Sequence, residues 1–199
     1  MEGQPMGHSA LDGVLVVEIG ERRAVAACGL LLAQAGATVI VVEPEDAGDN
    51  VKWKSRPTLM AGKSSLSLSD ANERIDSAIR AADVVLLSSD LDRPALSRLA
   101  AVIGADQIVC DITGFGPDAP PERQGWPEKI MQAYCGVADI TGPAEAPPTP
   151  SDVAVLEFHS GIYAAAGVLA AVRVRDRNGI VQRVDISMHE CGINSLATF

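Results

Sequence analysis

The chain has 199 residues, 47% of them hydrophobic, and its 16 basic and 26 acidic side chains give a formal net charge of −10. This length suits one domain with a sizeable core, and the acidic balance argues against a nucleic-acid partner, because binding phosphates needs a basic surface. No apolar run reaches the ~18 to 20 residues of a membrane span, so we expect no membrane partner. The four scattered cysteines form neither a CxxC pair nor a metal-ligand pattern, and the first ten residues carry no export signal. We therefore expect reduced thiols, a cytoplasmic location and no metal site.

The first elements form a βαβ unit, and we expect residues 1–12 before it to be disordered or a tail. Residues 14–18 and 38–42 are nearly continuous β-branched runs, typical of buried parallel strands. The Ala/Leu-rich segment 24–35 between them predicts a helix that ends at Gly36.

Strands continue to alternate with helices in the next part of the chain. After a polar loop, the pattern predicts strands over 65–68, 82–87 and 107–112, with helices over 70–81 and 94–103. This alternation predicts an α/β fold with a Rossmann-like, mostly parallel sheet, whose core we place at residues 13–115. The polar loop covers residues 44–60.

The last part of the chain has a different composition. Two Pro-rich loops, 114–127 and 142–152, flank a predicted helix over 129–138. A long small-residue helix, a strand and a final helix follow, over 157–175, 181–187 and 188–199. The final helix lacks a polar tail, which predicts that the chain is cut from a longer protein.

The turn after the first strand carries charges where a dinucleotide-binding fold has three glycines. Gly20 is its one glycine, and Glu43 ends the second strand where a ribose-binding acid would lie. A dehydrogenase is therefore one hypothesis. Arg22 and Arg23 begin the following helix, where they either meet a phosphate or are solvated. Lys63, on a loop before a strand, can likewise reach a phosphate or be exposed.

A second candidate region follows the strand over 107–112. The segment ITGFGPDAPP places Phe115 between two glycines at the carboxyl end of a parallel strand, the edge where open α/β sheets bind ligands. Glu128, Asp139 and Glu157 lie in or beside the Pro-rich part. Each can act as a nucleophile or proton-transfer group if it is buried near an electrophilic carbonyl, or can cap a helix.

Several segments, in this order, resemble one family: LDGVLVVEIG, GKSSLSLS, IVCDITGFGPDAPP and GIYAAAGVLAAVRVRDRNGIVQRVDISMHE. The family is that of the family III CoA-transferases, whose relatives include the α-methylacyl-CoA racemases. The resemblance runs from about Leu11 to the end of the chain and reaches only the N-terminal half of a typical member. It implies a Rossmann-like domain that carries CoA as a substrate, with no permanently bound cofactor. It also implies an interlocked homodimer, or pairing with a second CoA-transferase half.

The chemistry that the resemblance implies transfers CoA from an acyl-CoA to a carboxylic acid. An enzyme carboxylate attacks the thioester and forms first an anhydride and then an enzyme–CoA thioester. Counting back from Gln132, the position of the family's aspartate holds Glu128, so the resemblance implies Glu128 as the catalytic carboxylate. Pro127 stands where the racemases have a histidine, so the resemblance does not extend to racemase chemistry.

The resemblance also implies CoA contacts. They are Arg23 and Ala24 in the first turn, Lys63 in the GKSS segment, and Ser88 in place of a family asparagine. Because some family residues are replaced, a second hypothesis stays open. In it, the chain is a degenerate, non-catalytic copy that serves as a structural or CoA-binding partner of an active copy.

Overall fold

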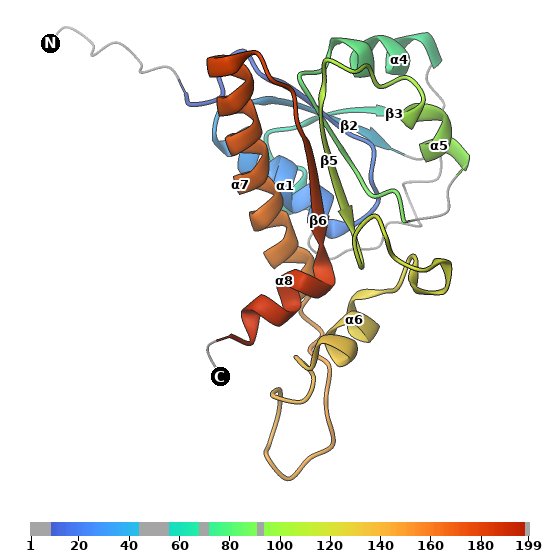
Figure 1. Ribbon diagram of the computed structural model, residues 1–199, viewed down its shortest axis with the longest axis vertical. Helices are drawn as coiled ribbons and strands as arrows, with labels where there is room; N and C mark the ends of the chain where they lie inside the picture. Colours follow the sequence, from blue (N-terminus) through green and yellow to red (C-terminus); the bar gives the residue numbers. More distant parts are fainter. Residues whose placement is uncertain (1–8, 44–55, 68–71, 91–93, 198–199) are drawn as a thin grey trace, which may run out of the picture.

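The computed structural model describes residues 9–43, 56–67, 72–90 and 94–197, and its centre is a six-stranded sheet (Figure 1). All the strands are parallel, in the order β3-β2-β1-β4-β5-β6. Their bounds are Leu15–Glu18 (β1), Thr38–Glu43 (β2), Ser64–Ser67 (β3), Val84–Leu87 (β4), Ile108–Thr113 (β5) and Arg183–Ser187 (β6). The strand order reverses between β1 and β4, so ligands are expected at the carboxyl ends of these two strands. The predicted α/β, Rossmann-like fold is confirmed.

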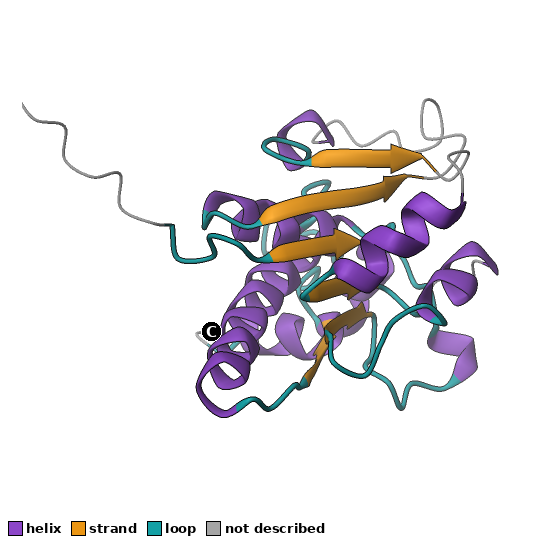
Figure 2. Ribbon diagram, turned by 90° about the horizontal axis from the view of Figure 1, so that it is seen from above, coloured by secondary structure: helices purple, strands orange, loops and turns teal. Residues whose placement is uncertain are grey.

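Helices cover both faces of the sheet (Figure 2). On one face lie α1 (Arg23–Gln34) and α7 (Val155–Asn178), and their apolar side chains share a core cluster with Val16, Val84 and Ile112 of the sheet. On the other face lie α4 (Asn72–Ala81) and α5 (Pro94–Ala100), which pack on Val17 and Val85. Adjacent residues of β1 and β4 thus point to opposite, equally apolar faces, which explains why these strands read as continuous hydrophobic runs.

Small residues let α7 lie close against α1. A Cβ added to Gly161 would lie 2.7 Å from Ala27 Cβ and 2.8 Å from Ala24 O, so a larger residue here would push the helices apart. Within the described part of the chain, α7 is the one helix long and apolar enough to cross a membrane, but half of that stretch is buried, as in the core helix of a soluble protein. The contact brings the first turns of α1 and α7 together.

The other described helices are α3 (Arg56–Leu59), the 3-10 helix η1 (Pro121–Arg123), α6 (Glu128–Cys135) and α8 (Met188–Ser195). Together α6, α8 and the start of α7 form a small third cluster around Met131, Leu156 and Met188. In Figure 1 these elements lie beyond the carboxyl ends of β5 and β6.

Three parts of the chain differ from the sequence prediction by more than the end residues of a helix or strand. The expected polar loop over 44–60 contains helix α3, and its residues 44–55 lie outside the described part of the chain. The segment expected to be disordered or a tail, 1–12, includes Leu11, which is buried in the core and whose N–H donates to Ala35 O at the end of α1. Residues 1–8 of that tail are not described. The sheet also extends beyond the predicted core, 13–115, because β6 pairs with β5.

Candidate functional site

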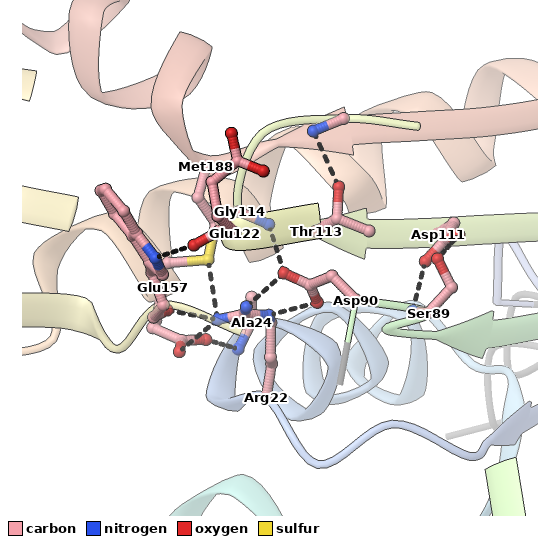
Figure 3. A network of polar contacts seen from close by, with 12 residues as sticks. Arg22, Ala24, Ser89, Asp90, Asp111, Thr113, Gly114, Glu122, Glu157 and Met188 are labelled. Carbon is pink, nitrogen blue, oxygen red and sulfur yellow. Dashed lines mark hydrogen bonds and ion pairs between the residues drawn. The ribbon is translucent and has the colours of Figure 1, made fainter. Parts of the chain in front are cut away.

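Polar side chains from distant parts of the chain meet at the carboxyl edge of the sheet, around the start of α1 (Figure 3). Arg22 precedes α1, Asp90 follows β4, Gly114 follows β5, Glu157 lies in the first turn of α7 and Met188 begins α8. The convergence follows from the parallel topology, which brings the carboxyl ends of all the strands to one edge.

Glu157 is a buried carboxylate of this group, with 7% of its surface exposed. Its Oε2 accepts a hydrogen bond from the N–H of Ala24, at 2.8 Å, and its Oε1 lies 3.7 Å from Arg22 Nη1. The carboxylate therefore faces the N-terminal end of α1, where free N–H groups favour a negative charge. Burial nevertheless raises the pKa of Glu157, although Arg22 and the Ala24 N–H act in the opposite direction.

Glu128, which the family resemblance implies as the catalytic carboxylate, is half-buried and caps a helix. Its Oε1 accepts from Gln132 Nε2 at 2.7 Å and from the N–H of Leu156 at 2.9 Å, and its Oε2 accepts from the N–H of Glu157 at 3.0 Å. Leu156 and Glu157 lie in the first turn of α7, whose N-cap, Ala154, makes no side-chain hydrogen bond. Glu128 thus supplies from α6 the cap that α7 lacks in its own sequence. The third candidate, Asp139, is exposed.

Three of the four predicted CoA contacts gather at the turn between β1 and α1. Arg23 lies close enough to Glu157 to lower its pKa, and the N–H of Ala24 is hydrogen-bonded to Glu157. Ser88 lies beneath the turn, since a Cβ added to Gly20 would be 2.8 Å from Ser88 Oγ. This hydroxyl is buried, and among the described residues it has no hydrogen-bond partner.

The fourth predicted contact, Lys63, does not reach this turn. Its Nζ lies 2.5 Å from Glu18 Oε1 and donates to Ala26 O at 2.7 Å. The side chains of Lys63 and Glu18 are 0% and 1% exposed, respectively. Gly29 makes room for the pair, because a Cβ there would lie only 1.6 Å from Glu18 Oε1. The Lys63 ammonium is thus enclosed between β1 and α1, and its contact with CoA stays a prediction.

The Glu18–Lys63 pair should make the stability of the protein depend on pH. Burial raises the pKa of Glu18 to about 7, against the lowering effect of Lys63. A carboxyl with a higher pKa in the folded state holds its proton more tightly there, so its contribution to stability is present below about pH 4.5 and is lost as the pH rises through 7. We expect the free energy of unfolding to fall over this range by a few kcal/mol more in the native protein than in Glu18→Gln, measured by urea unfolding. Equal slopes in the two proteins would contradict the assignment.

Arg22, for which the sequence left a phosphate contact or a solvated position open, is not solvated. The side chain is 4% exposed and forms a side-on pair with Asp90, with distances of 3.1 Å from Nε to Oδ1 and 2.5 Å from Nη2 to Oδ2 (Figure 3). Asp90 also accepts from the N–H of Gly114, at 2.8 Å. Arg22 therefore joins the turn after β1 to the segments that follow β4 and β5.

An aromatic cluster lines the same edge and was not predicted from the sequence. The ring of Phe115, in the predicted GFG loop, lies 5.3 Å from the rings of Trp126, Tyr134 and His189. The Arg123 guanidinium lies 5.6 Å from the Phe115 ring centre and 5.2 Å from that of Tyr134. Phe115, Arg123, Trp126 and Tyr134 lie within 20 residues of one another, whereas the fold brings in His189 from the start of α8.

The described residues contain no group of three or more His, Cys, Asp or Glu side chains that could hold a metal ion. All four cysteines are free thiols and buried. Burial raises the pKa of Cys110 to about 12 and that of Cys135 to about 11, so these thiols are not activated as nucleophiles. The carboxylates at this edge are held against helix N-termini and Arg22.

Comparisons with known proteins agree on one family. The profile of CoA-transferase family III matches residues 11–198. Succinate–glutarate CoA-transferase of Agrobacterium fabrum is 27% identical over 94% of this chain and 53% of its own length. Succinyl-CoA–D-citramalate CoA-transferase of Chloroflexus aurantiacus is 30% identical over 90% of this chain and 49% of its own length.

A solved structure supports the same fold. The crystal structure of a CAIB/BAIF family protein from Brucella suis superposes with a TM-score of 0.79 at 26% identity, covering 96% of this chain and 56% of the other. The chain thus spans about half the length of the curated relatives it matches.

Proposed function

Because the chain belongs to CoA-transferase family III, we propose that it takes part in transferring CoA from an acyl-CoA to a carboxylic acid, with Glu157 as the attacking carboxylate. The observation that carries this proposal is the position of Glu157. It is a buried carboxylate at the carboxyl edge of the sheet, beside two of the predicted CoA contacts, Arg23 and Ala24.

The hydrogen bonds of the two neighbouring glutamates favour Glu157 over Glu128 as the nucleophile. The Glu128 carboxylate accepts three hydrogen bonds, two of them from backbone N–H groups that have no other partner in the helix. Using Glu128 as a nucleophile would uncap α7. Glu157 accepts one backbone hydrogen bond and has a looser ion pair at 3.7 Å, so its Oε1 is the oxygen better able to form a new bond.

The first half of the proposed reaction consists of two substitution steps that involve Glu157. Its carboxylate oxygen bonds to the acyl carbon, the carbon–sulfur bond breaks, and the electron pair leaves with CoA as the thiolate. The thiolate then attacks the Glu157 carbonyl of the anhydride, which releases the first acid as a carboxylate and leaves CoA on Glu157. The acceptor acid reverses these steps. A carboxylate suits this task because it forms covalent intermediates that divide one difficult transfer into easier ones.

Glu128 has a positioning role in this proposal. It holds the first turn of α7 by the N–H of Leu156 and the N–H of Glu157 itself. The backbone of Glu157 is thereby fixed while its side chain reaches α1. Movement of ~1 Å at a reacting group can cost about 100-fold in rate, so this cap supports the reaction without touching the substrate.

The names of the relatives suggest a first substrate to test. Two of them are named for reactions of succinyl-CoA or succinate. We therefore propose succinyl-CoA as a donor.

We also propose that the chain acts in the cytoplasm and pairs with a second copy of itself or with a second CoA-transferase half. The exposed side chains of Ile162, Tyr163 and Ile193, on α7 and α8, are available for such a contact.

Isotope exchange tests the function without knowledge of the acceptor acid. The protein is incubated with succinyl-CoA and radiolabelled succinate, and label that enters succinyl-CoA is measured after chromatography. We expect label to appear in proportion to protein, and to stay absent with heat-denatured protein. Absence of exchange with succinyl-CoA and with a panel of other short acyl-CoA and acid pairs would contradict the proposal.

A non-catalytic, CoA-binding or structural role is the second candidate. The engagement of both Glu157 oxygens by protein groups favours this alternative. Calorimetric titration with CoA, together with a negative exchange assay, would identify a CoA-binding partner, and no heat of binding would leave a structural role. The dehydrogenase hypothesis based on Gly20 and Glu43 is not retained, because the family match covers both residues.

A further inference from the structure

The aromatic cluster at the carboxyl edge carries one inference, which rests on the proposed CoA transfer and specifies its substrates. We propose that Arg123 binds the free carboxylate of a dicarboxylic substrate, that is, the carboxylate that is not joined to CoA. Arg123 is then a residue that determines specificity. The inference does not depend on whether Glu128 or Glu157 reacts, because it concerns the other end of the acyl group.

Aromatic rings hold the Arg123 guanidinium in place. Arg123 ends the 3-10 helix η1, and its guanidinium carbon lies 5.6 Å from the ring centre of Phe115 and 5.2 Å from that of Tyr134. These two rings meet edge to face at 5.3 Å, and Trp126 packs edge to face against both. A guanidinium on the faces of rings keeps the N–H groups at its own edge available for a planar partner.

The N–H groups of the Arg123 side chain have no acceptor among the residues that the structure describes. The side chain is half-buried, and its contacts there are with the two rings. By contrast, Arg22, Arg98, Arg175 and Arg183 each pair with an aspartate. In a chain with a net charge of −10, an anionic substrate needs a local cation to bind, and Arg123 has the free donors to provide it.

The cluster adjoins the polar groups around which CoA transfer is proposed. The carbonyl oxygen of Trp126 accepts from Arg22 Nη1 at 3.4 Å, and Tyr134 lies on α6, the helix that begins at Glu128. Arg123 and Glu128 belong to the same segment between β5 and α7. We therefore expect an acyl group bound at this edge to extend toward the rings.

A carboxylate is the anion that suits a guanidinium held in this way. It is planar, and its two oxygens accept two parallel hydrogen bonds from the fork of N–H groups. The apolar surface of Phe115 and Trp126 can cover the methylene groups between the two ends of a diacid. A monocarboxylic acyl group of equal length would place a methyl group against the guanidinium and leave its donors unpaired, so the site should favour the diacid.

The first test compares two acyl groups of equal length. Isotope exchange is measured with succinyl-CoA and succinate, and with butyryl-CoA and butyrate, in which a methyl group replaces the free carboxylate. The value of kcat/KM for each CoA ester is determined for the native protein, Arg123→Met, Arg123→Lys and Arg98→Met. Arg98, on α5, forms an exposed pair with Asp76 and provides the matched control.

We expect Arg123→Met to lower kcat/KM for succinyl-CoA by about 10- to 100-fold, the effect of losing a charge-assisted hydrogen bond, and to leave that for butyryl-CoA within about twofold of the native value. Arg123→Lys keeps the charge without the fork, so its loss should be smaller but equally selective. Arg98→Met should change neither value.

An equal loss with both esters would mean that Arg123 acts on the CoA portion or on the fold, and would overturn the proposal. Unchanged values with both esters would overturn it too. Circular dichroism verifies that each variant is folded. If Arg123→Met does not fold, the selective loss in Arg123→Lys decides the question.

A binding measurement separates this inference from the proposed function. The chain has two tryptophans, so in Trp53→Phe the fluorescence reports on Trp126 alone. Succinate should change this fluorescence with saturation, butyrate at the same concentration should not, and Arg123→Met in the same background should weaken succinate binding about 10-fold or more.

The two proposals fail in different ways. A protein that shows no exchange but binds succinate through Arg123 would support this inference and contradict the proposed function. Exchange of succinyl-CoA that does not depend on Arg123 would do the reverse. Succinate binding of equal strength in the native and Arg123→Met proteins would overturn the inference.

Discussion

Glu157→Gln is expected to lower the rate of CoA exchange by a factor on the order of 10⁴ or more, because an amide cannot form the anhydride or the CoA thioester. The measurement is the label exchange between succinate and succinyl-CoA, with the native protein and the variant at equal concentration. Loss of this size would place Glu157 among the groups that react.

The fold of Glu157→Gln should be retained. The glutamine carbonyl can still accept the hydrogen bond from the Ala24 N–H, and burial already disfavours the ionised form of this side chain. Glu190→Gln, an exposed carboxylate on α8, is the matched control and should keep native exchange. Native exchange in Glu157→Gln would contradict the proposed role, whatever the control shows.

Glu128→Ala is expected to lower the free energy of unfolding by about 2 to 3 kcal/mol. The substitution removes the acceptor of three hydrogen bonds and leaves the first N–H groups of α7 without their cap. Urea unfolding followed by circular dichroism measures the change. Exchange should be weakened but not abolished, because the attacking group remains.

Lys129→Ala is the matched control for this prediction, one residue along the same helix. Lys129 pairs with Asp152 in solvent, where the two side chains are 61% and 91% exposed, so we expect less than about 1 kcal/mol of change. If Glu128→Ala were as stable as Lys129→Ala and lost all exchange, Glu128 would be the better candidate for the nucleophile.

Much of the fold could be predicted because the local sequence pattern indicates whether most segments form a strand or a helix. The segments 14–18 and 38–42 are predicted as strands and form β1 (Leu15–Glu18) and β2 (Thr38–Glu43). The reason is that short runs of β-branched residues favour buried strands. The helix over 24–35 is α1, displaced by one residue. Helix α3 was missed because four residues within a polar loop give no periodic signal.

The candidate site was only partly predictable, because its roles depend on partners far away in the sequence. Arg22 and Asp90 are 68 residues apart, and nothing in either local pattern indicates that they pair. Lys63 looked exposed on its loop, whereas its partner, Glu18, lies 45 residues earlier on β1. Glu128 is predicted by counting along a motif of the resembling family. Its hydrogen bonds to the first turn of α7 could not be predicted, because they depend on how α6 and α7 pack.

The most direct test of the central claim is to find which carboxylate carries CoA during turnover. The protein is mixed with succinyl-CoA, quenched with hydroxylamine, which converts an enzyme thioester or anhydride into a hydroxamate, digested and examined by mass spectrometry. The proposed role of Glu157 predicts a hydroxamate at Glu157 that depends on succinyl-CoA and is absent from Glu157→Gln. A hydroxamate at Glu128 in an active protein, with Glu157 unmodified, would contradict it.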